Sequence, residues 1–131
     1  MSKVVLDASA LLAVLRREPG RDVVAPLLVG AAVSAVNYSE VIKKAVEAGG
    51  KASETRALLR LMDLVVVAFD EPQAVAAGAL FEQTRSMGLS FADRACLGLG
   101  IARELPVITA ERKFAETKLP VEVRLIRGKT H

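Results

Sequence analysis

The chain has 131 residues, of which 52% are hydrophobic and 25% are charged. This composition excludes an intrinsically disordered protein, and the length predicts a single domain, residues 1–131, whose core needs no disulfide or structural metal. Asp7 interrupts the first apolar run, and the uncharged stretch at residues 23–39 is shorter than the ~20 apolar residues of a membrane span. The one cysteine, Cys96, cannot form an internal disulfide, so we expect a cytoplasmic protein.

Basic residues are in slight excess, with 18 Lys and Arg against 15 Asp and Glu and a net charge of +3. Four of the 15 acids are candidates for one shared pocket, which leaves 11 acidic against 18 basic residues elsewhere. A basic surface around an acidic pocket suits the binding of a polyanion. A mildly basic, solvated surface explains the same excess, so charge alone leaves both interpretations open.

Short apolar runs rich in β-branched residues alternate with segments of helical periodicity along the whole chain. In chain order, we expect a strand at residues 4–6, helices at 10–17 and 21–29, a weaker strand at 32–33, helices at 37–48 and 53–63, a strand at 64–69, helices at 72–87 and 91–104, a strand at 107–108 and a terminal edge strand at 121–126. The continuous apolar runs are typical of strands buried on both faces. The fold class is therefore α/β, with three layers and a central, mainly parallel sheet of four to five strands flanked by helices.

Four acids follow strands or stand where helices are expected to begin: Asp7, Glu40, Asp93 and Glu111. Ligands of open parallel sheets bind outside the carboxyl ends of the strands, where residues distant in sequence converge. Each acid also has a structural explanation. Asn37 to Glu40 and Ser90 to Asp93 have the spacing of capping boxes, Asp7 can cap the first helix, and Glu111 can favour a helix dipole.

Clustered carboxylates repel one another and so require a compensating cation. Oxygen ligands without Cys or His partners suit Mg²⁺ or Mn²⁺. Such ions activate water, bind the scissile phosphate and stabilise the leaving oxygen. The single histidine, His131, is the last residue, which favours water activated by a metal over a histidine base.

The same residues resemble the motifs of PIN-domain ribonucleases, in the form found in VapC toxins of type II toxin–antitoxin systems. The matching segments are residues 4–12, 37–41, 89–97, 106–112 and 123–127, spread over nearly the whole chain. The resemblance implies an endoribonuclease dependent on Mg²⁺ or Mn²⁺, usually dimeric, which a cognate antitoxin inhibits. It implies that Asp7, Glu40 and Asp93 bind the metal, and that Ser9 and Thr109 are polar residues near that site. Glu111 takes the place of the fourth acid, where the family more often has Asp.

Other residues near the motifs have two interpretations each. Arg94 and Arg112, beside two of the acids, are candidates for contacts with substrate phosphate, and surface solvation is equally consistent with their positions. Cys96 lies within an apolar helix and is expected in the core. Most of the five aromatic residues are also expected in the core, so the sequence does not predict a base-stacking surface.

Two apolar helix stripes exceed what a small core obviously needs: Leu11, Leu12, Val14 and Leu15, and Val23, Val24, Leu27 and Leu28. They predict either a partner-binding surface or simple core packing. Two other functions remain open. One is a catalytically silent binding module on the same fold, and the other is a phospho-acceptor receiver domain with Asp70 and Thr109 after its strands.

Overall fold

The computed structural model describes residues 1–128, so His131 lies outside the described residues. Its centre is a parallel five-stranded sheet in the order β3-β2-β1-β4-β5, which confirms the predicted fold class. The strands are β1 (Val5–Leu6), β2 (Ala32–Ser34), β3 (Val65–Val67), β4 (Val107–Thr109) and β5 (Val123–Leu125). The order reverses between β1 and β4, the point at which open α/β sheets bind ligands.

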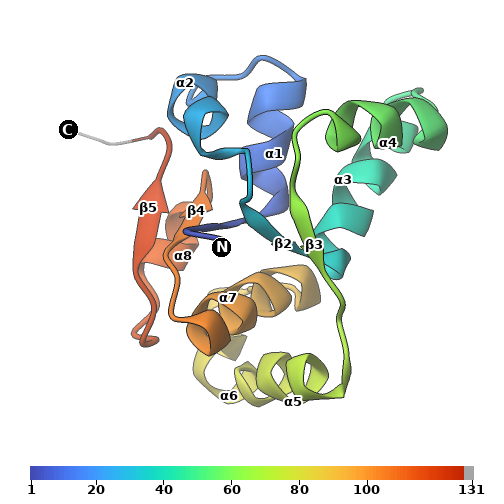
Figure 1. The fold of residues 1–131 in the computed structure, drawn as a ribbon. Coiled ribbons are helices and arrows are strands. Elements are labelled where there is room, and N and C mark those ends of the chain that lie inside the picture. Colours follow the sequence, from blue (N-terminus) through green and yellow to red (C-terminus); the bar gives the residue numbers. More distant parts are fainter. Residues whose placement is uncertain (129–131) are drawn as a thin grey trace.

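Helices cover both faces of the sheet (Figure 1). They are α1 (Ala8–Leu15), α2 (Arg21–Val24), the 3₁₀ turn η1 (Ala25–Leu27), α3 (Ala35–Glu47), α4 (Ala52–Arg60), α5 (Glu71–Ala79), α6 (Phe81–Thr84), η2 (Arg85–Met87), α7 (Phe91–Arg103) and α8 (Arg112–Ala115). No helix among residues 1–128 has the length and apolarity needed to cross a membrane.

The two faces of the sheet carry separate cores because successive strand residues point to opposite sides. Val4 and Leu6 pack with α1, α2, α3 and α4, whereas Val5 packs with α7 and α8. The glycine at position 100 lets α7 approach β4 closely, since a Cβ there would lie 2.6 Å from Val107 Cγ2.

Two expectations about strand and helix are corrected by the structure. The strand expected at residues 64–69 to be buried on both faces is instead the sheet's edge strand, and Val65 and Val66 are 45% and 46% exposed. The helix expected over residues 72–87 is divided into α5, α6 and η2. The terminal strand at the opposite edge, β5, is an edge strand as expected.

The strand order also removes the receiver-domain alternative. Receiver domains of the CheY type have the order 2-1-3-4-5, which differs from the order found here. Asp70 follows the edge strand β3, and its carboxylate caps α5 by accepting a hydrogen bond of 3.2 Å from the Gln73 N–H. Asp70 is therefore a helix-capping residue on a different fold.

Candidate active site

Asp7 lies at the end of β1, beside the point where the strand order reverses. It is the N-cap of α1, and its side chain is only 4% exposed. Asp7 Oδ1 accepts hydrogen bonds from the Ser9 hydroxyl at 2.7 Å and from the Ala10 N–H at 3.0 Å. Asp7 Oδ2 accepts a hydrogen bond from Thr109 Oγ1 at 2.6 Å. The expected capping role is confirmed, and the buried carboxylate is held on both oxygens.

Ser9 and Thr109 form a polar network around Asp7 that joins α1 to the end of β4. Ser9 Oγ accepts from the Ala110 N–H at 2.9 Å, and Thr109 Oγ1 accepts from the Glu111 N–H at 2.9 Å. Their two hydroxyl oxygens are 3.3 Å apart. The network fixes Asp7 across the junction of β1 and β4, so these two residues are positioned to orient the candidate acid.

Burial sets the protonation of Asp7. Desolvation raises its pKa from the ordinary value of 3.8 to about 6, against the lowering effect of the hydrogen bonds from Thr109, Ala10 and Ser9. The negative charge of Asp93 raises the pKa further, which shows that these two acids are near one another. A positive ion close to Asp7 would reverse this shift.

The raised pKa of Asp7 predicts a specific pH dependence of stability without metal. The folded state holds the proton more tightly than the unfolded state, so this stabilisation is complete below about pH 4 and is lost as the pH rises through about 6. The Asp7→Asn variant has no carboxyl group here and does not lose this stabilisation. Between about pH 4 and pH 7, we therefore expect its free energy of unfolding to rise by about 2 kcal/mol relative to that of wild type. Urea denaturation of both proteins in EDTA measures the difference, and parallel pH profiles would contradict the burial cost.

Asp93 serves the start of α7 while its charge acts on Asp7. The Ser90 N–H donates to Asp93 Oδ2 at 2.8 Å, and the Asp93 N–H donates to Ser90 Oγ at 3.2 Å, which confirms the expected capping box. The cap therefore fixes where this half-buried carboxylate lies.

Glu40 does not cap a helix, because α3 begins earlier than the sequence predicts. Ser34 is the N-cap, its side chain accepts from the Val36 N–H, and Glu40 lies in the second turn. The Asn37 side chain is instead buried, and its Nδ2 donates to the Ala92 carbonyl at 3.0 Å. Asn37 thus connects α3 to the residue before Asp93. The sequence did not indicate this role, because Asn37 and Glu40 have the spacing of a capping box.

Three of the four predicted acids act electrostatically on one buried thiol. Cys96 is fully buried, as expected for a core residue. Burial raises the pKa of its thiol, and the negative charges of Asp7, Asp93 and Glu40 each raise this pKa further. These charges come from Asp7 between β1 and α1, from Glu40 on α3 and from Asp93 on α7.

Glu111 is placed differently from the other acids. It is exposed at the N-cap of α8, and its side chain makes no capping hydrogen bond. Its backbone N–H, through the bond to Thr109 Oγ1, connects it to the network of Asp7.

The two candidate arginines differ in how they are held. Arg94 is half-buried, donates from Nη1 to the Leu89 carbonyl at 3.3 Å, and its guanidinium carbon lies 5.5 Å from the centre of the Phe81 ring. Its Nε is buried without a hydrogen-bond partner among residues 1–128. Arg112 is exposed in the first turn of α8, directly after Glu111.

Two hollows of the described surface are lined by residues other than the candidate acids. One, of about 460 Å³, is lined by residues that include Tyr38, Arg56 and Arg60. Another, of about 410 Å³, is an apolar groove at the far end of α1 from Asp7, and its lining includes Val14, Leu15, Leu28, Val29, Leu58, Leu61 and Met62. Neither is lined by a candidate acid.

A family model described as the PIN domain matches residues 4–119. No curated protein sequence matches the chain. Similar solved structures include DNA-bound VapBC from Salmonella typhimurium, at 18% identity and a TM-score of 0.77, covering 97% of this chain and 100% of that chain. A toxin–antitoxin complex from Klebsiella pneumoniae has 19% identity and a TM-score of 0.76, with coverages of 95% and 98%.

A third similar structure is VapC20 from Mycobacterium tuberculosis, described as a sarcin–ricin loop cleaving toxin, with 15% identity and a TM-score of 0.74. It covers 87% of this chain and 94% of that chain. At these identities the likeness establishes a common fold. The family model spans most of the sequence and the strand arrangement agrees with it, so the chain belongs to the PIN-domain family.

Proposed function

We propose that the chain is an endoribonuclease, dependent on Mg²⁺ or Mn²⁺, that acts as a VapC-like toxin. The observation that carries this proposal is the buried carboxylate of Asp7 at the switch point of the sheet, which is held on both oxygens by Ser9 and Thr109 and feels the charge of Asp93. A hydrogen-bonded acid at a sheet's switch point is well placed for chemistry on a bound ligand. We assign the metal to Asp7, Glu40 and Asp93, with Glu111 as an outer fourth acid.

The residues suit a hard divalent ion by their chemistry. Asp7 is a buried carboxylate with a raised pKa, and a nearby cation would favour its ionised form. Residues 1–128 contain no group of three or more Asp, Glu, His or Cys side chains that lie close enough together to hold a metal ion. Magnesium binds through few carboxylates and keeps several waters, so it does not need a closed cage. When bound, such an ion supplies activated water and offsets charge on the phosphate.

Other residues hold the acids and the substrate. Ser9 and Thr109 keep Asp7 oriented through donated hydrogen bonds, and Asn37 holds the start of α7. Arg94 and Arg112 are assigned to the RNA backbone, as cations beside Asp93 and Glu111. The basic excess outside the acids supports a polyanionic substrate, and the description of VapC20 as a toxin that cleaves the sarcin–ricin loop supports RNA.

We also propose an antitoxin protein as the partner, together with a homodimer and a cytoplasmic location. The similar structures from Klebsiella pneumoniae and Salmonella typhimurium are described as toxin–antitoxin and VapBC complexes. Of the two predicted stripes, Leu11, Leu12 and Val24 are core residues, whereas Val14, Leu15 and Leu28 line the apolar groove. Leu58 of α4 and Leu61, the residue directly after this helix, also line the groove and are 53% and 80% exposed.

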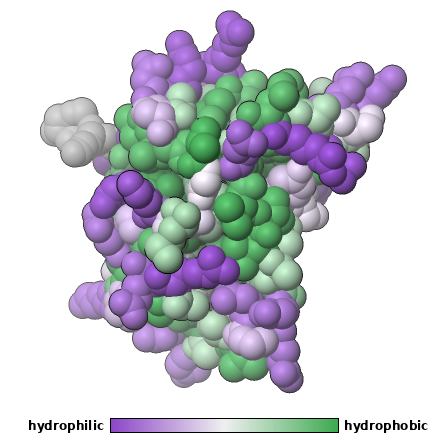
Figure 2. Space-filling view, viewed as in Figure 1, coloured by the Kyte–Doolittle hydropathy of each residue, from purple (hydrophilic) through white to green (hydrophobic). Residues whose placement is uncertain are grey.

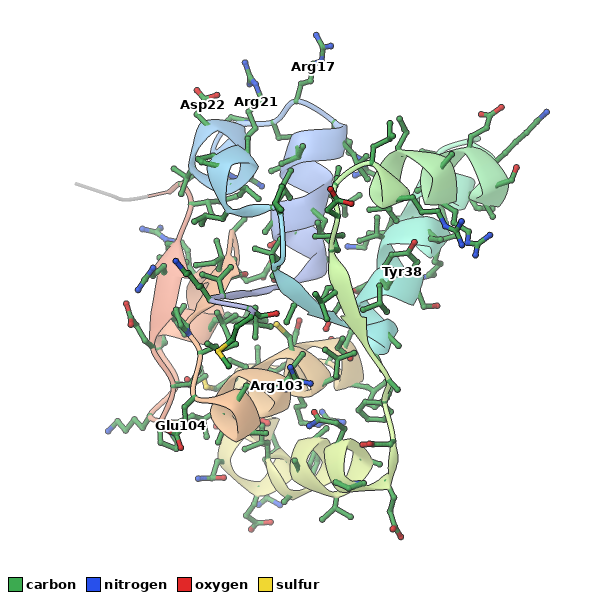
Figure 3. All side chains as sticks on the ribbon, in the orientation of Figure 1. Arg17, Arg21, Asp22, Tyr38, Arg103 and Glu104 are labelled. Atoms are coloured by element: carbon green, nitrogen blue, oxygen red, sulfur yellow. The ribbon has the colours of Figure 1, made fainter. Side chains whose placement is uncertain are left out.

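The apolar groove offers room for the nonpolar face of a partner helix. Figure 2 shows the hydrophobic surface between α2 and α4, and Figure 3 shows Arg17, Arg21 and Asp22 projecting beyond α1 and α2. Charged side chains therefore border this end of the molecule. The groove lies at the far end of α1 from Asp7, so a partner held there needs an extended tail to reach the acids.

A catalytically silent binding module is the second candidate function. It is favoured by the exposure of Glu111 and by the finding that no three Asp, Glu, His or Cys side chains of residues 1–128 are grouped so that they could hold a metal ion. Such a module would bind nucleic acid without cleaving it. Binding of metal to the acids and RNA cleavage by the purified chain separate the two functions.

Manganese is expected to raise the melting temperature of the wild-type protein, because an ion that binds only the folded state stabilises it by mass action. We expect the increase to be much smaller in Asp93→Asn. Asp70→Asn is the matched control, because Asp70 caps α5 outside the site and Asn is an equally good cap. A thermal-shift titration with MnCl₂ measures all three proteins. Equal shifts in wild type and Asp93→Asn would contradict the metal assignment.

A further inference from the structure

Three phenylalanines and one arginine form a surface strip beside Asp93. The Phe69 and Phe91 rings meet edge to face, with centroids 5.4 Å apart and an interplanar angle of 82°. Arg94 lies three residues after Phe91 on α7, and its guanidinium group is over the Phe81 ring. We call Phe69, Phe91, Arg94 and Phe81 the aromatic strip.

The exposure of this strip contradicts the expectation that most of the aromatic residues belong to the core. Phe91 and Phe81 are 51% and 50% exposed, whereas Phe114 is fully buried. Large apolar side chains left in contact with water, and gathered together, frequently mark binding surfaces. The edge-to-face contact and the cation–ring contact are the geometries that aromatic side chains favour, so they hold these rings in place.

The strip lies along the edge of the sheet that carries the acids. Phe69 comes two residues after the end of β3, and Phe91 is the first residue of α7, two before Asp93. The hydrogen bond from Asn37 to the Ala92 carbonyl fixes the segment between Phe91 and Asp93 against α3. The carboxyl edge therefore continues from Asp7 at β1, past Asp93, to a rigid aromatic surface next to β3.

An unpaired RNA base is the ligand that fits such a surface at this place. Unstacked bases bind to the faces of Phe rings and to arginine planes, and proteins that bind single-stranded RNA combine such rings with cations that track the backbone. We propose that the aromatic strip binds an unpaired nucleobase next to the phosphate that is cleaved; this rests on the ribonuclease function proposed above. The strip selects single-stranded RNA over duplex, because a paired base has no free face to stack.

The test compares steady-state cleavage of a short single-stranded RNA in Mn²⁺ by four proteins. Phe91→Leu keeps an apolar side chain but removes the ring, and we expect the KM to rise about tenfold with little change in kcat. Phe91→Trp keeps a ring and is expected to retain the wild-type KM. Val23→Ala is the control, since Val23 is a similarly exposed apolar residue on α2 outside the strip. Melting temperatures verify that all four proteins are folded.

A substrate with an abasic nucleotide beside the mapped cleavage site tests the contact itself. The abasic change is expected to raise the KM of wild type about as much as Phe91→Leu does, and to add little in that variant. An unchanged KM in Phe91→Leu, or fully additive effects, would overturn the strip proposal alone. So would a change of oligomeric state in Phe91→Leu by size-exclusion chromatography, which would assign the strip to a contact between copies. A wild-type chain that cleaves no RNA contradicts the proposed function, and the strip proposal with it.

Discussion

Replacing Asp7 or Asp93 by Asn is expected to lower the rate of RNA cleavage at least about 100-fold. The amide keeps the shape of the side chain and one of its two acceptor oxygens, but it has no charge to hold a divalent ion. Asp7→Asn is also expected to fold stably, because it removes a carboxylate that is costly to bury. Initial rates with saturating RNA and Mn²⁺, together with circular dichroism, measure activity and folding separately.

The other acids provide graded comparisons for this experiment. Glu111 is exposed, so we expect Glu111→Gln to lower the rate of RNA cleavage about tenfold or less. We expect Glu111→Asp to keep most of the activity. Asp70→Asn is expected to cleave as wild type does. Full activity in Asp7→Asn or Asp93→Asn would refute the assignment of that residue to the active site. Wild-type activity in Glu111→Gln would refute only the assignment of Glu111 as a fourth acid.

Expression of the chain alone is expected to arrest the growth of its host, because an uninhibited ribonuclease destroys RNA that the cell needs. Asp7→Asn is expected to leave growth unaffected. Co-expression of a cognate antitoxin should relieve the arrest and yield a complex that purifies with the chain. Growth curves and affinity purification measure both effects, and a wild-type chain that is harmless and purifies alone contradicts the toxin assignment.

The apolar groove gives this experiment a structural control. Leu61 is 80% exposed in the groove, so Leu61→Asp should weaken partner binding and restore the arrest while leaving RNA cleavage unchanged. Val23 is 48% exposed on α2 and does not line the groove, so Val23→Asp should still be rescued. Rescue of Leu61→Asp to the level of Val23→Asp would place the partner elsewhere on the surface.

The parallel sheet was predictable from the sequence because its strands are short, continuous β-branched runs. What the sequence did not reveal was which strand lies at the edge, since Val65, Val66 and Val67 have the same composition as a central strand. That outcome depends on the strand order, a property of the whole chain. The helices capped by Asp7 and Ser34 each begin two residues earlier than expected, because several polar residues near each start are equally good capping candidates.

The candidate acids were predictable for a similar reason, since each follows a strand or lies near the start of a helix at the carboxyl edge. Their arrangement in space was not, because the place of Glu40 depends on how α3 packs against α7. The aromatic strip was missed because composition does not distinguish a buried Phe from an exposed one. The spacing of Phe91 and Arg94, three residues apart beside Asp93, is the one sequence signal that places them on the same side of a helix.

The most direct test of the account is the metal dependence of RNA cleavage by the purified wild-type chain. We expect single-stranded RNA to be cut internally in Mn²⁺ or Mg²⁺, to remain intact in EDTA, and to be cut again when the ion is restored in excess. The products should carry 5′-phosphate and 3′-hydroxyl ends, because activated water rather than the ribose 2′-hydroxyl attacks the phosphate. Cleavage that persists in EDTA and leaves 2′,3′-cyclic phosphate ends, or intact RNA under every condition, would contradict a metal-dependent ribonuclease built on Asp7, Glu40 and Asp93.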